Sequence, residues 1–256
     1  MQVTVVSHAG IANRIKNILS AISQYYVSTQ HETINYIFPS IPLVEDPSRT
    51  YPEDWRLVVT PEEEKYCDEY KTIDLLFEKT PEYFVKKYLK VIDKLQINSE
   101  LIEYVSEFVD AWDNMPGVHI RSWYCDKRRF HSNEIFEQEI DKLDPDQKFF
   151  FCCDNSDVQK HFIDKYGDRV VTYDRQIFND PRLAESGQHD DIQLTADAFV
   201  ELLMLSKCAT IIGTYLSYFD EVAWWMGGCQ SKVIIPTPTN CEKEFNDYNK
   251  LVYLKK

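Results

Sequence analysis

The sequence contains little glycine, no cysteines at the spacing of a metal-binding pair, and no long apolar run. Seven glycines among 256 residues argue against a glycine-rich repeat or a fibrous protein. The seven cysteines include no CxxC pair, so no zinc site of that kind is expected. The longest apolar stretches, such as residues 199–205, are far shorter than the ~20 residues that a membrane-spanning helix needs, and no membrane span is expected.

Basic residues are outnumbered by acidic ones. The chain has 28 Lys and Arg against 42 Asp and Glu, which gives a net charge of −14. A field of this sign repels nucleic acid and anionic membranes, so neither is expected as a partner. An anionic ligand therefore needs a local group of positive charges. The densest basic run, residues 127–129, follows Arg121 closely, although such runs are also typical of solvated surfaces.

Signatures of several other phosphate, metal and hydrolase sites are missing. The chain has no GxxxxGK, GxGxxG, HExxH or GxSxG sequence. Its DxD triplet, Asp144-Pro145-Asp146, contains proline and precedes an expected strand, so we interpret it as a turn and expect no metal. The odd, scattered cysteines and the lack of a signal peptide predict a reducing compartment, the cytoplasm.

Short apolar segments alternate with helical patterns in the second half of the chain. The expected strands are residues 118–122, 148–153, 169–172, 210–213 and 232–235. The expected helices are residues 132–143, 156–166, 195–206 and 217–226. This alternation is typical of a parallel, doubly wound α/β sheet, and predicts a Rossmann-type domain over residues 114–256.

The first half of the chain is interpreted as a smaller α/β domain, residues 1–113. Its expected strands are residues 3–7, 33–38 and 73–77. Its expected helices are residues 11–22, 81–95 and 99–112. The boundary is set at Met115-Pro116-Gly117, because proline and glycine interrupt the helical pattern there.

Sheets of this kind bind ligands outside the carboxyl ends of their strands. One expected strand ends with His119-Ile120-Arg121, and alternation places His119 and Arg121 on the same face. The planar guanidinium of Arg121 suits a diphosphate, because it bonds two phosphate oxygens at once. In the alternative interpretation, Arg121 pairs with an acidic residue and His119 is a buried histidine with its own partner. That alternative is favoured for His119 and not for Arg121.

The most apolar expected strand ends in Asp154 and Asn155. The carboxylate of Asp154 is a candidate acceptor for a ribose hydroxyl or a base edge. The alternative, of equal weight, makes Asn155 or Ser156 the N-cap of the next helix, with Asp154 beside it.

The last of these strand ends is Gly213-Thr214-Tyr215-Leu216-Ser217. The hydroxyls of Thr214 and Ser217, with the N–H groups of the following helix turn, predict an anion-binding nest. Helix capping uses the same groups, so it is compatible with binding. Several such donors together with Arg121 would hold a diphosphate without a metal.

The first expected strand leads into Gly10-Ile11-Ala12-Asn13-Arg14. Gly10 allows a close approach of the backbone to a ligand, and Asn13 is suited to cap the helix or to orient a ligand. A simple helix start with Arg14 on the surface is the favoured alternative for this segment taken alone.

Taken in order, these segments resemble the fucosyltransferase superfamily of α1,6-fucosyltransferases, rhizobial nodulation fucosyltransferases and protein O-fucosyltransferases. The similar motifs are Gly10-Ile11-Ala12-Asn13-Arg14, Gly117-Val118-His119-Ile120-Arg121, Phe149-Phe150-Phe151-Cys152-Cys153-Asp154-Asn155, and the segment from Leu202 through Gly213-Thr214-Tyr215-Leu216-Ser217-Tyr218-Phe219. They cover mainly residues 115–228 and the first twenty. Members often have a second arginine after the first, whereas Ser122 stands there in this chain.

The resemblance implies a GT-B-like fold, GDP-fucose as the donor, inversion at the anomeric carbon, and neither metal nor cofactor. It implies that Arg121 binds the β-phosphate, that Asp154 faces the nucleoside, and that Thr214, Ser217 and Phe219 line the donor site. The other candidate donor-binding residues are Gly10, Asn13, Arg14, His119 and Gly213.

The expected reaction is therefore transfer of fucose from GDP-fucose to a hydroxyl of a glycan acceptor. Asp126, in the loop after the arginine strand, is the first candidate for the general base, with Asp191 and His189 as alternatives. Two other functions stay open: a transferase that uses another nucleotide sugar, and a non-catalytic module that binds nucleotide sugars or glycans. Ser122 supports the second of these.

Overall fold

The computed structural model describes residues 99–122, 132–175, 192–215 and 217–236, together with residues 3–5, 11, 12, 15, 19, 34–36, 86, 88–90, 92, 93, 97 and 177. The chain forms two compact units. The first contains Met1–Glu107 and Gly187–Val200, and the second contains Phe108–Ser186 and Glu201–Lys256. The domain boundary near residue 114 stays a prediction.

In the first unit, β1 (Val3–Val5) pairs in parallel with β2 (Ile34–Tyr36). The described residues of the helix that follows β1 are all buried: Ile11, Ala12, Ile15 and Leu19. Ile11, Ile15 and Leu19 lie four positions apart and Ala12 precedes Ile15 by three, so they share one face of the helix, as the apolar pattern predicts. The expected strand at residues 73–77 lies outside the described residues.

The second unit contains a five-stranded parallel sheet. Its strands are β3 (Pro116–Ile120), β4 (Phe149–Cys153), β5 (Val170–Val171), β6 (Thr210–Ile212) and β7 (Lys232–Ile234). They are arranged in the order β5-β4-β3-β6-β7, and every neighbouring pair is parallel. The predicted parallel, doubly wound α/β sheet is confirmed.

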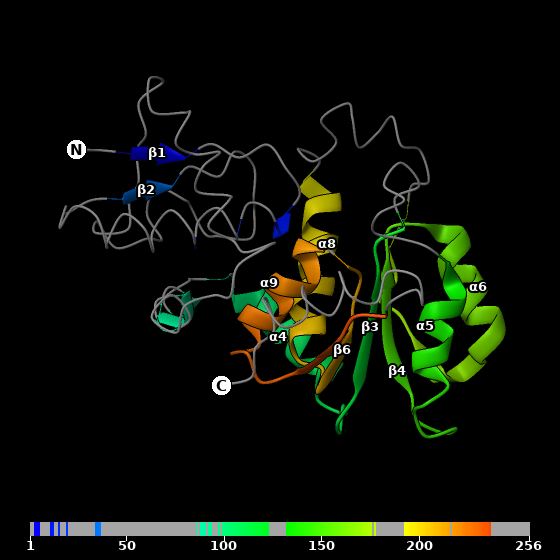
Figure 1. Cartoon of the computed structure of the whole chain (residues 1–256). Helices are drawn as coiled ribbons and strands as arrows, with labels where there is room; N and C mark the ends of the chain where they lie inside the picture. Colours follow the sequence, from blue (N-terminus) through cyan, green and yellow to red (C-terminus); the bar gives the residue numbers. More distant parts are fainter. Residues whose placement is uncertain are drawn as a thin grey trace. The chain divides into compact units, whose positions relative to one another are not determined.

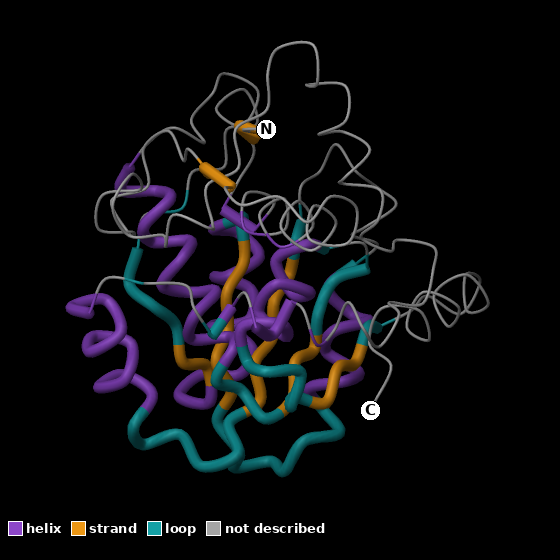
Figure 2. The backbone as a smooth tube through the Cα atoms, turned by 90° about the vertical axis from the view of Figure 1, so that its left-hand side faces the viewer, coloured by secondary structure: helices purple, strands orange, loops and turns teal. Residues whose placement is uncertain are grey.

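Helices cover both faces of this sheet, and Figures 1 and 2 show the strands side by side between them. The helices that lie wholly in the second unit are α5 (Asn133–Ile140), α6 (Ser156–Tyr166) and α9 (Tyr218–Met226). Helix α4 (Ser99–Val109) belongs mostly to the first unit, and α8 (Ile192–Ser206) has residues in both. In Figure 1, α5 and α6 lie against one face, and α9 with the C-terminal part of α8 lies against the other.

Strands β3 and β4 are buried on both faces. All five residues of β3 and all five of β4 are buried, which accounts for the nearly continuous apolar sequence of β4. On the face toward α5 and α6, Phe151 stacks on Phe162 with ring centroids 4.9 Å apart. On the other face, a Cβ added to Gly117 would lie 2.6 Å from Cδ1 of Leu205, so a larger residue here would require the side chains beneath α8 to shift.

Alternation along β3 determines which side chains can reach the ligand edge. Val118 and Ile120 point into the apolar cluster with α5 and α6. Gly117 and His119 point to the opposite face, toward α8 and α9. The predicted strand at residues 118–122 is therefore observed two residues earlier, and Arg121 lies just beyond its end.

The helix that follows β4 begins with a side-chain cap. The Asn155 side chain accepts hydrogen bonds from the N–H groups of Asp157 and Val158, at 2.9 and 3.2 Å. This is the capping alternative that the sequence left open, with Asp154 beside the cap.

Helix α5 differs from the prediction at its first residue. Ser132 occupies the N-cap position, but its side chain makes no capping hydrogen bond. Its hydroxyl bonds to the carboxylate of Glu134 instead, and this contact lowers the pKa of Glu134.

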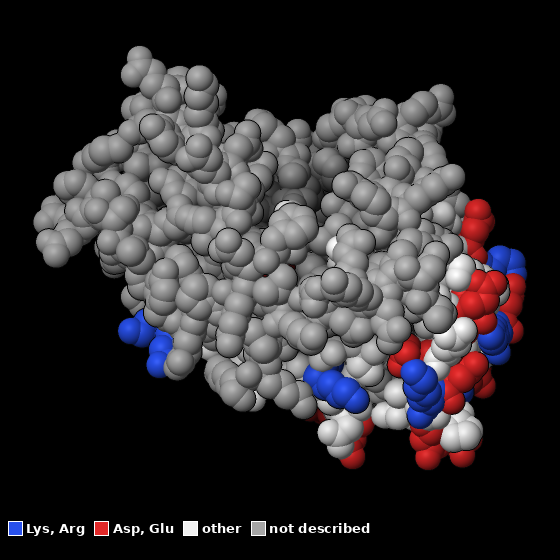
Figure 3. Space-filling view, viewed as in Figure 1, with Lys and Arg blue, Asp and Glu red and all other residues white. Residues whose placement is uncertain are grey.

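The outer surfaces of α5 and α6 carry interspersed positive and negative side chains (Figure 3). Glu137 of α5 accepts hydrogen bonds from His161 and Lys165 of α6. None of the helices in the described part of the chain is long and apolar enough to cross a membrane.

The Asp144-Pro145-Asp146 triplet lies in the turn between α5 and β4. There, Asp144 accepts a hydrogen bond from the N–H of Asp146 at 3.0 Å. This turn precedes β4, so it lies at the amino end of the parallel strands, on the opposite side of the sheet from the carboxyl ends. The interpretation of the triplet as a turn agrees with this geometry.

Candidate functional site

Next to Arg121, the chain stops adding strands on one side of β3 and begins to add them on the other side. From β3 the chain proceeds to β4 and β5 on one side, and then returns to β6 and β7 on the other. In open α/β sheets, ligands bind outside the carboxyl ends of the strands at such a point. The carboxyl ends of β3 and β6 flank it here, and they lead into Arg121 and Gly213.

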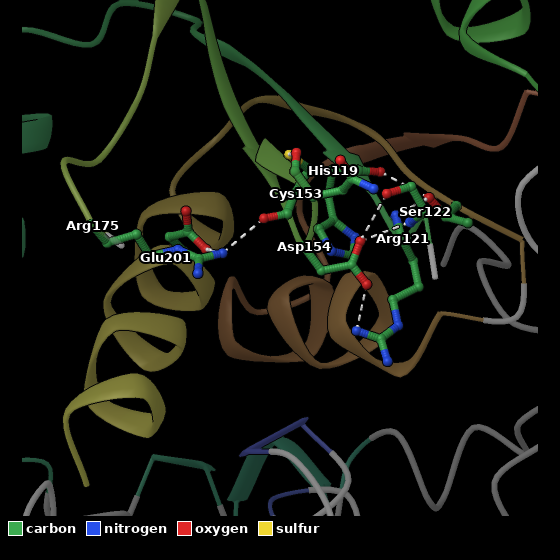
Figure 4. A network of polar contacts seen from close by, with 9 residues as sticks. His119, Arg121, Ser122, Cys153, Asp154, Arg175 and Glu201 are labelled. Carbon is green, nitrogen blue, oxygen red and sulfur yellow. Dashed lines mark hydrogen bonds and ion pairs between the residues drawn. The ribbon is translucent and has the colours of Figure 1, made fainter. Parts of the chain in front are cut away.

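Arg121 makes an ion pair with Asp154 at this edge (Figure 4). The distance from Nη1 to Oδ2 is 2.6 Å, and the two side chains are 31% and 24% exposed. The alternative in which Arg121 pairs with an acidic residue is therefore what the structure contains. The pair is not buried, however, because both side chains keep contact with solvent.

The backbone beyond β3 is held by side chains of both neighbouring strands. The ladder between β3 and β6 ends at Val118 and Ile212. Three residues after Val118, the N–H of Arg121 donates to Oγ1 of Thr214 at 2.8 Å, and that hydroxyl donates to the carbonyl oxygen of His119 at 3.0 Å.

The other side of the same segment is fixed by Asp154. The N–H of Ser122 donates to Oδ1 of Asp154 at 2.8 Å, and the Ser122 hydroxyl donates to the same oxygen at 3.1 Å. Asp154 thus uses one oxygen for Ser122 and the other for the guanidinium of Arg121. Ser122, where an arginine was noted as missing, has a structural role here.

His119 is buried between α9 and the sheet. Its Nδ1 lies 2.6 Å from Oδ1 of Asp220, and its side chain is 6% exposed. Its ring stacks on Phe219, with the ring centroids 4.5 Å apart. This is the buried histidine with its own partner that the sequence favoured as the alternative, and donor binding by His119 stays a prediction.

The predicted anion nest after β6 contains a carboxylate of the chain itself. The N–H of Thr214 donates to Oδ2 of Asp220 at 2.8 Å. Asp220 approaches so closely that a Cβ added to Gly213 would lie 2.7 Å from its Cγ. Thr214 is fully buried, and its hydroxyl bonds to the N–H of Arg121 and the carbonyl oxygen of His119. Ser217 occupies the N-cap position of α9, but its side chain makes no capping hydrogen bond.

Another ion pair, which is largely buried, lies beside β4 and was not predicted. Nη2 of Arg175 lies 2.8 Å from Oε2 of Glu201, and the same nitrogen donates to the carbonyl oxygen of Cys153 at 2.8 Å (Figure 4). Burial alone lowers the pKa of Arg175, but the charge and hydrogen bond of Glu201 reverse this and raise it. A single acid within the apolar stretch of residues 199–205 was the signal for this pair, because a charge on an apolar helix face needs a partner.

Several predicted site residues lie outside the described residues: Gly10, Asn13, Arg14, Asp126, His189, Asp191 and the basic run at 127–129. The structure brings the others together at the carboxyl ends of β3, β4 and β6. These are His119, Arg121, Asp154, Gly213, Thr214, Ser217 and Phe219. Their roles toward a ligand stay predictions.

The sheet, its strand order and its helices define a GT-B-like α/β fold of Rossmann type. The chain has a fucosyltransferase-like fold: its structure is similar to solved structures of the fucosyltransferase NodZ. One is the NodZ α-1,6-fucosyltransferase soaked with GDP-fucose, with a TM-score of 0.55 and 15% identity over 88% of this chain and 93% of that one. Another is fucosyltransferase NodZ from Bradyrhizobium, with a TM-score of 0.54 and 14% identity over 87% of this chain and 93% of that one. A selenomethionine form from Bradyrhizobium has a TM-score of 0.56 and 15% identity over 87% and 91% of the two chains. No protein-family model matches the sequence, and no curated protein matches it.

Proposed function

We propose that this chain is an inverting, metal-independent glycosyltransferase that transfers L-fucose from GDP-fucose to a hydroxyl of a glycan. The observation that carries the proposal is the position of Arg121, a solvent-accessible guanidinium where the strand order changes direction. A NodZ structure of the same fold was soaked with GDP-fucose, which supports a guanosine diphosphate sugar as the donor.

The leaving group explains why a fixed cation is needed. As an acceptor hydroxyl attacks the anomeric carbon, the bond to the diphosphate breaks and negative charge accumulates on GDP. A guanidinium already in position stabilises this transition state more than the ground state. Arg121 supplies that charge in the proposal, in the role that a divalent cation has in metal-dependent transferases.

The ion pair with Asp154 is compatible with this role. Pairs that remain in contact with solvent contribute only about 0–1 kcal/mol, because water and salt screen them. A diphosphate carries more charge than one carboxylate, and the guanidinium has five N–H donors for sharing. In the proposal, some N–H groups of Arg121 therefore bond to the β-phosphate instead of Asp154. The basic run at residues 127–129 adds positive charge.

The acceptor hydroxyl needs a general base, and Asp126 stays the first candidate. It follows β3 by only a few residues in the sequence, so its loop begins at the carboxyl edge of the sheet. Asp191 and His189 stay the alternatives. A location in the cytoplasm and the absence of a cofactor also stay predictions.

The direct test is a donor screen in the presence of EDTA, with GDP, GDP-fucose, UDP and UDP-sugars, which measures both binding and sugar release. We expect binding of GDP and GDP-fucose and release of GDP. In Arg121→Ala and Arg121→Lys, turnover should fall by roughly 100- to 1000-fold, equivalent to ~2.7–4 kcal/mol. Arg169→Lys is the matched control, because Arg169 packs on Phe149 and Tyr166 at the amino end of the strands. Near-normal turnover of either Arg121 variant contradicts the assignment.

A non-catalytic module that binds a nucleotide sugar is the second candidate. It is favoured by the pairing of Arg121 with Asp154 and by Ser122, which leaves one cation at this strand end among the described residues. The same screen separates the two functions, since a binding module shows affinity for GDP-fucose without release of GDP. A preference for UDP-sugars would instead indicate a transferase for another donor.

A further inference from the structure

Asp220 occupies the first turn of α9 and is fully buried. Its two carboxylate oxygens have different partners. Oδ1 lies 2.6 Å from Nδ1 of His119 on β3, and Oδ2 accepts the N–H of Thr214, just beyond β6, at 2.8 Å. One side chain therefore connects the two strands that flank the change of direction in the sheet.

These contacts indicate which nitrogen of the His119 ring carries the proton. An ionised carboxylate has no hydrogen to donate, so Nδ1 of His119 carries the proton of this hydrogen bond. The other oxygen, Oδ2, accepts the N–H of Thr214, so both oxygens of Asp220 act as acceptors, as in an ionised carboxylate. In neutral His119, the other nitrogen, Nε2, is then the one without a proton.

The same contacts extend to the backbone of Arg121. Asp220 holds the N–H of Thr214, and the Thr214 hydroxyl bridges the N–H of Arg121 and the carbonyl of His119. A shift of the Asp220 carboxylate therefore moves Thr214, and with it the backbone from which the Arg121 guanidinium projects.

We propose that Asp220 is a positioning residue of the donor site, which sets the tautomer of His119 and, through Thr214, the placement of Arg121. Asp220 does not contact the diphosphate itself in this proposal. Its carboxylate occupies the position at the start of α9 where an external anion would bind, so the donor phosphate binds to Arg121 instead. The inference rests on the proposed function, because its consequence is measured on GDP binding.

Asp220→Asn is the informative substitution, because it keeps the shape of the side chain. The amide oxygen can still accept the N–H of Thr214, and the amide NH₂ then faces Nδ1 of His119. An NH₂ group only donates, so Nδ1 loses its proton and His119 changes to the other neutral tautomer. The hydrogen bond from the N–H of Thr214 is retained, whereas donor and acceptor exchange roles in the hydrogen bond with His119.

The experiment measures GDP affinity by calorimetry and the nitrogen-15 shifts of the His119 ring by NMR, at a temperature where each variant is folded. In the wild type, Nδ1 should be protonated. In Asp220→Asn, the protonated nitrogen should change to Nε2, and GDP should bind roughly 10- to 100-fold more weakly, as expected when a supporting group misplaces a binding group. Glu221→Gln is the matched control, because it removes a second fully buried carboxylate from the same turn. If the effect of Asp220→Asn comes from its contacts with His119 and Thr214, the GDP affinity of Glu221→Gln should stay within about three-fold of the wild type.

Thr214 gives a second, independent pair of variants. Thr214→Ser keeps the bridging hydroxyl and should bind GDP nearly as the wild type does, whereas Thr214→Val removes the hydroxyl at almost constant volume and should weaken binding. If Asp220→Asn and Thr214→Val both fold and bind GDP with wild-type affinity, the inference is wrong although the proposed function stands. A wild type that binds no GDP contradicts the proposed function, and this inference with it.

Discussion

At the end of β6, Gly213 leaves room for a carboxylate that belongs to the next helix. A Cβ at this position would lie 2.7 Å from Cγ and 2.8 Å from Oδ2 of Asp220. From the sequence, Gly213 was one of the candidate donor-binding residues. In the structure, the group that approaches it closely is Asp220.

Gly213→Ala should therefore destabilise the protein through Asp220. We expect a loss of about 1–3 kcal/mol, as for other overpacked buried positions. In an Asp220→Ala background, where the carboxylate is absent, the same substitution should cost much less. Urea unfolding of the wild type, both single variants and the double variant forms the cycle that measures this coupling. Additive losses would show that the crowding has another source.

The buried thiols of β4 illustrate how burial controls reactivity. Burial raises the pKa of Cys153 to about 12, and the charges of Asp154 and Glu201 raise it as well, against a hydrogen bond with the backbone of Asn155. The thiolate is the reactive form, so the Cys153 thiol is unreactive in the folded protein at pH 8. Cys152 is fully buried and its pKa is also raised, whereas Cys229 is partly exposed.

Alkylation at pH 8, followed residue by residue with mass spectrometry, should therefore modify Cys229 long before Cys153. Cys153 should react only when pH approaches 12 or when urea unfolds the chain. Equal rates at the two positions in the folded protein would contradict the burial of β4.

Among the elements, β3 was predicted from the sequence, but its end was not predicted correctly. The pattern predicted the strand, but placed its end at Ser122 instead of Ile120. The reason is chemical: the N–H groups of Arg121 and Ser122 bond to side chains of Thr214 and Asp154, not to neighbouring strands. Side-chain acceptors that continue a ladder come from residues far away in the sequence, so no local pattern reveals them.

The helices were predicted well where their apolar faces are regular. Helix α6 was predicted to the residue, and α8 begins three residues earlier than predicted. The buried acids Glu201 of α8 and Asp220 of α9 were missed as site residues because their partners lie on other elements. Their position within apolar sequence was the signal, since buried charges in proteins are paired.

The contact between α5 and α6 should make stability depend on pH. Burial by itself raises the pKa of Glu137, but hydrogen bonds from Lys165 and His161 outweigh burial, and the pKa is lowered from 4.5. A lowered folded-state pKa stabilises the protein above the pKa of the unfolded state, and this stabilisation is lost as pH falls through the folded-state pKa.

Glu137→Gln should therefore be less stable than the wild type at pH 7, by about 1 kcal/mol or less because Lys165 is well exposed to solvent. The difference should shrink as the pH is lowered below 4.5, where the wild-type carboxylate also becomes neutral. Thermal or urea unfolding at a series of pH values gives both curves. A difference that stays constant from pH 7 to pH 3 would contradict the contribution of this contact.

For the whole molecule, the proposed function predicts that GDP stabilises the fold. At a concentration 100 times the dissociation constant, a ligand of the folded state adds about 2.7 kcal/mol. For a chain of this size, that corresponds to a rise in Tm of roughly 5–10 °C. The rise should be the same with EDTA present, because the proposal needs no cation. Loss of the effect with EDTA, and its return with Mg²⁺ or Mn²⁺, would contradict metal independence.

The class of the fold was predictable from the alternation of strands and helices, and the strand order was not. Alternation is a local property, whereas the order β5-β4-β3-β6-β7 depends on which distant strands pair. The sequence therefore named Arg121, Asp154 and Thr214 as separate strand ends. Only the pairing of β3 with both β4 and β6 brings the three into one hydrogen-bonded group.

The central place of β3 has a consequence for biosynthesis. Its partner on one side, β4, follows soon in the sequence, but the contact of Arg121 with Thr214 on the other side joins residues 93 positions apart. During synthesis on the ribosome, β3 is therefore an unprotected apolar edge until β6 emerges, and such edges promote aggregation. A nascent chain that stalls before residue 210 would expose this edge to chaperones, and the arginine site would be among the last parts of the second unit to assemble.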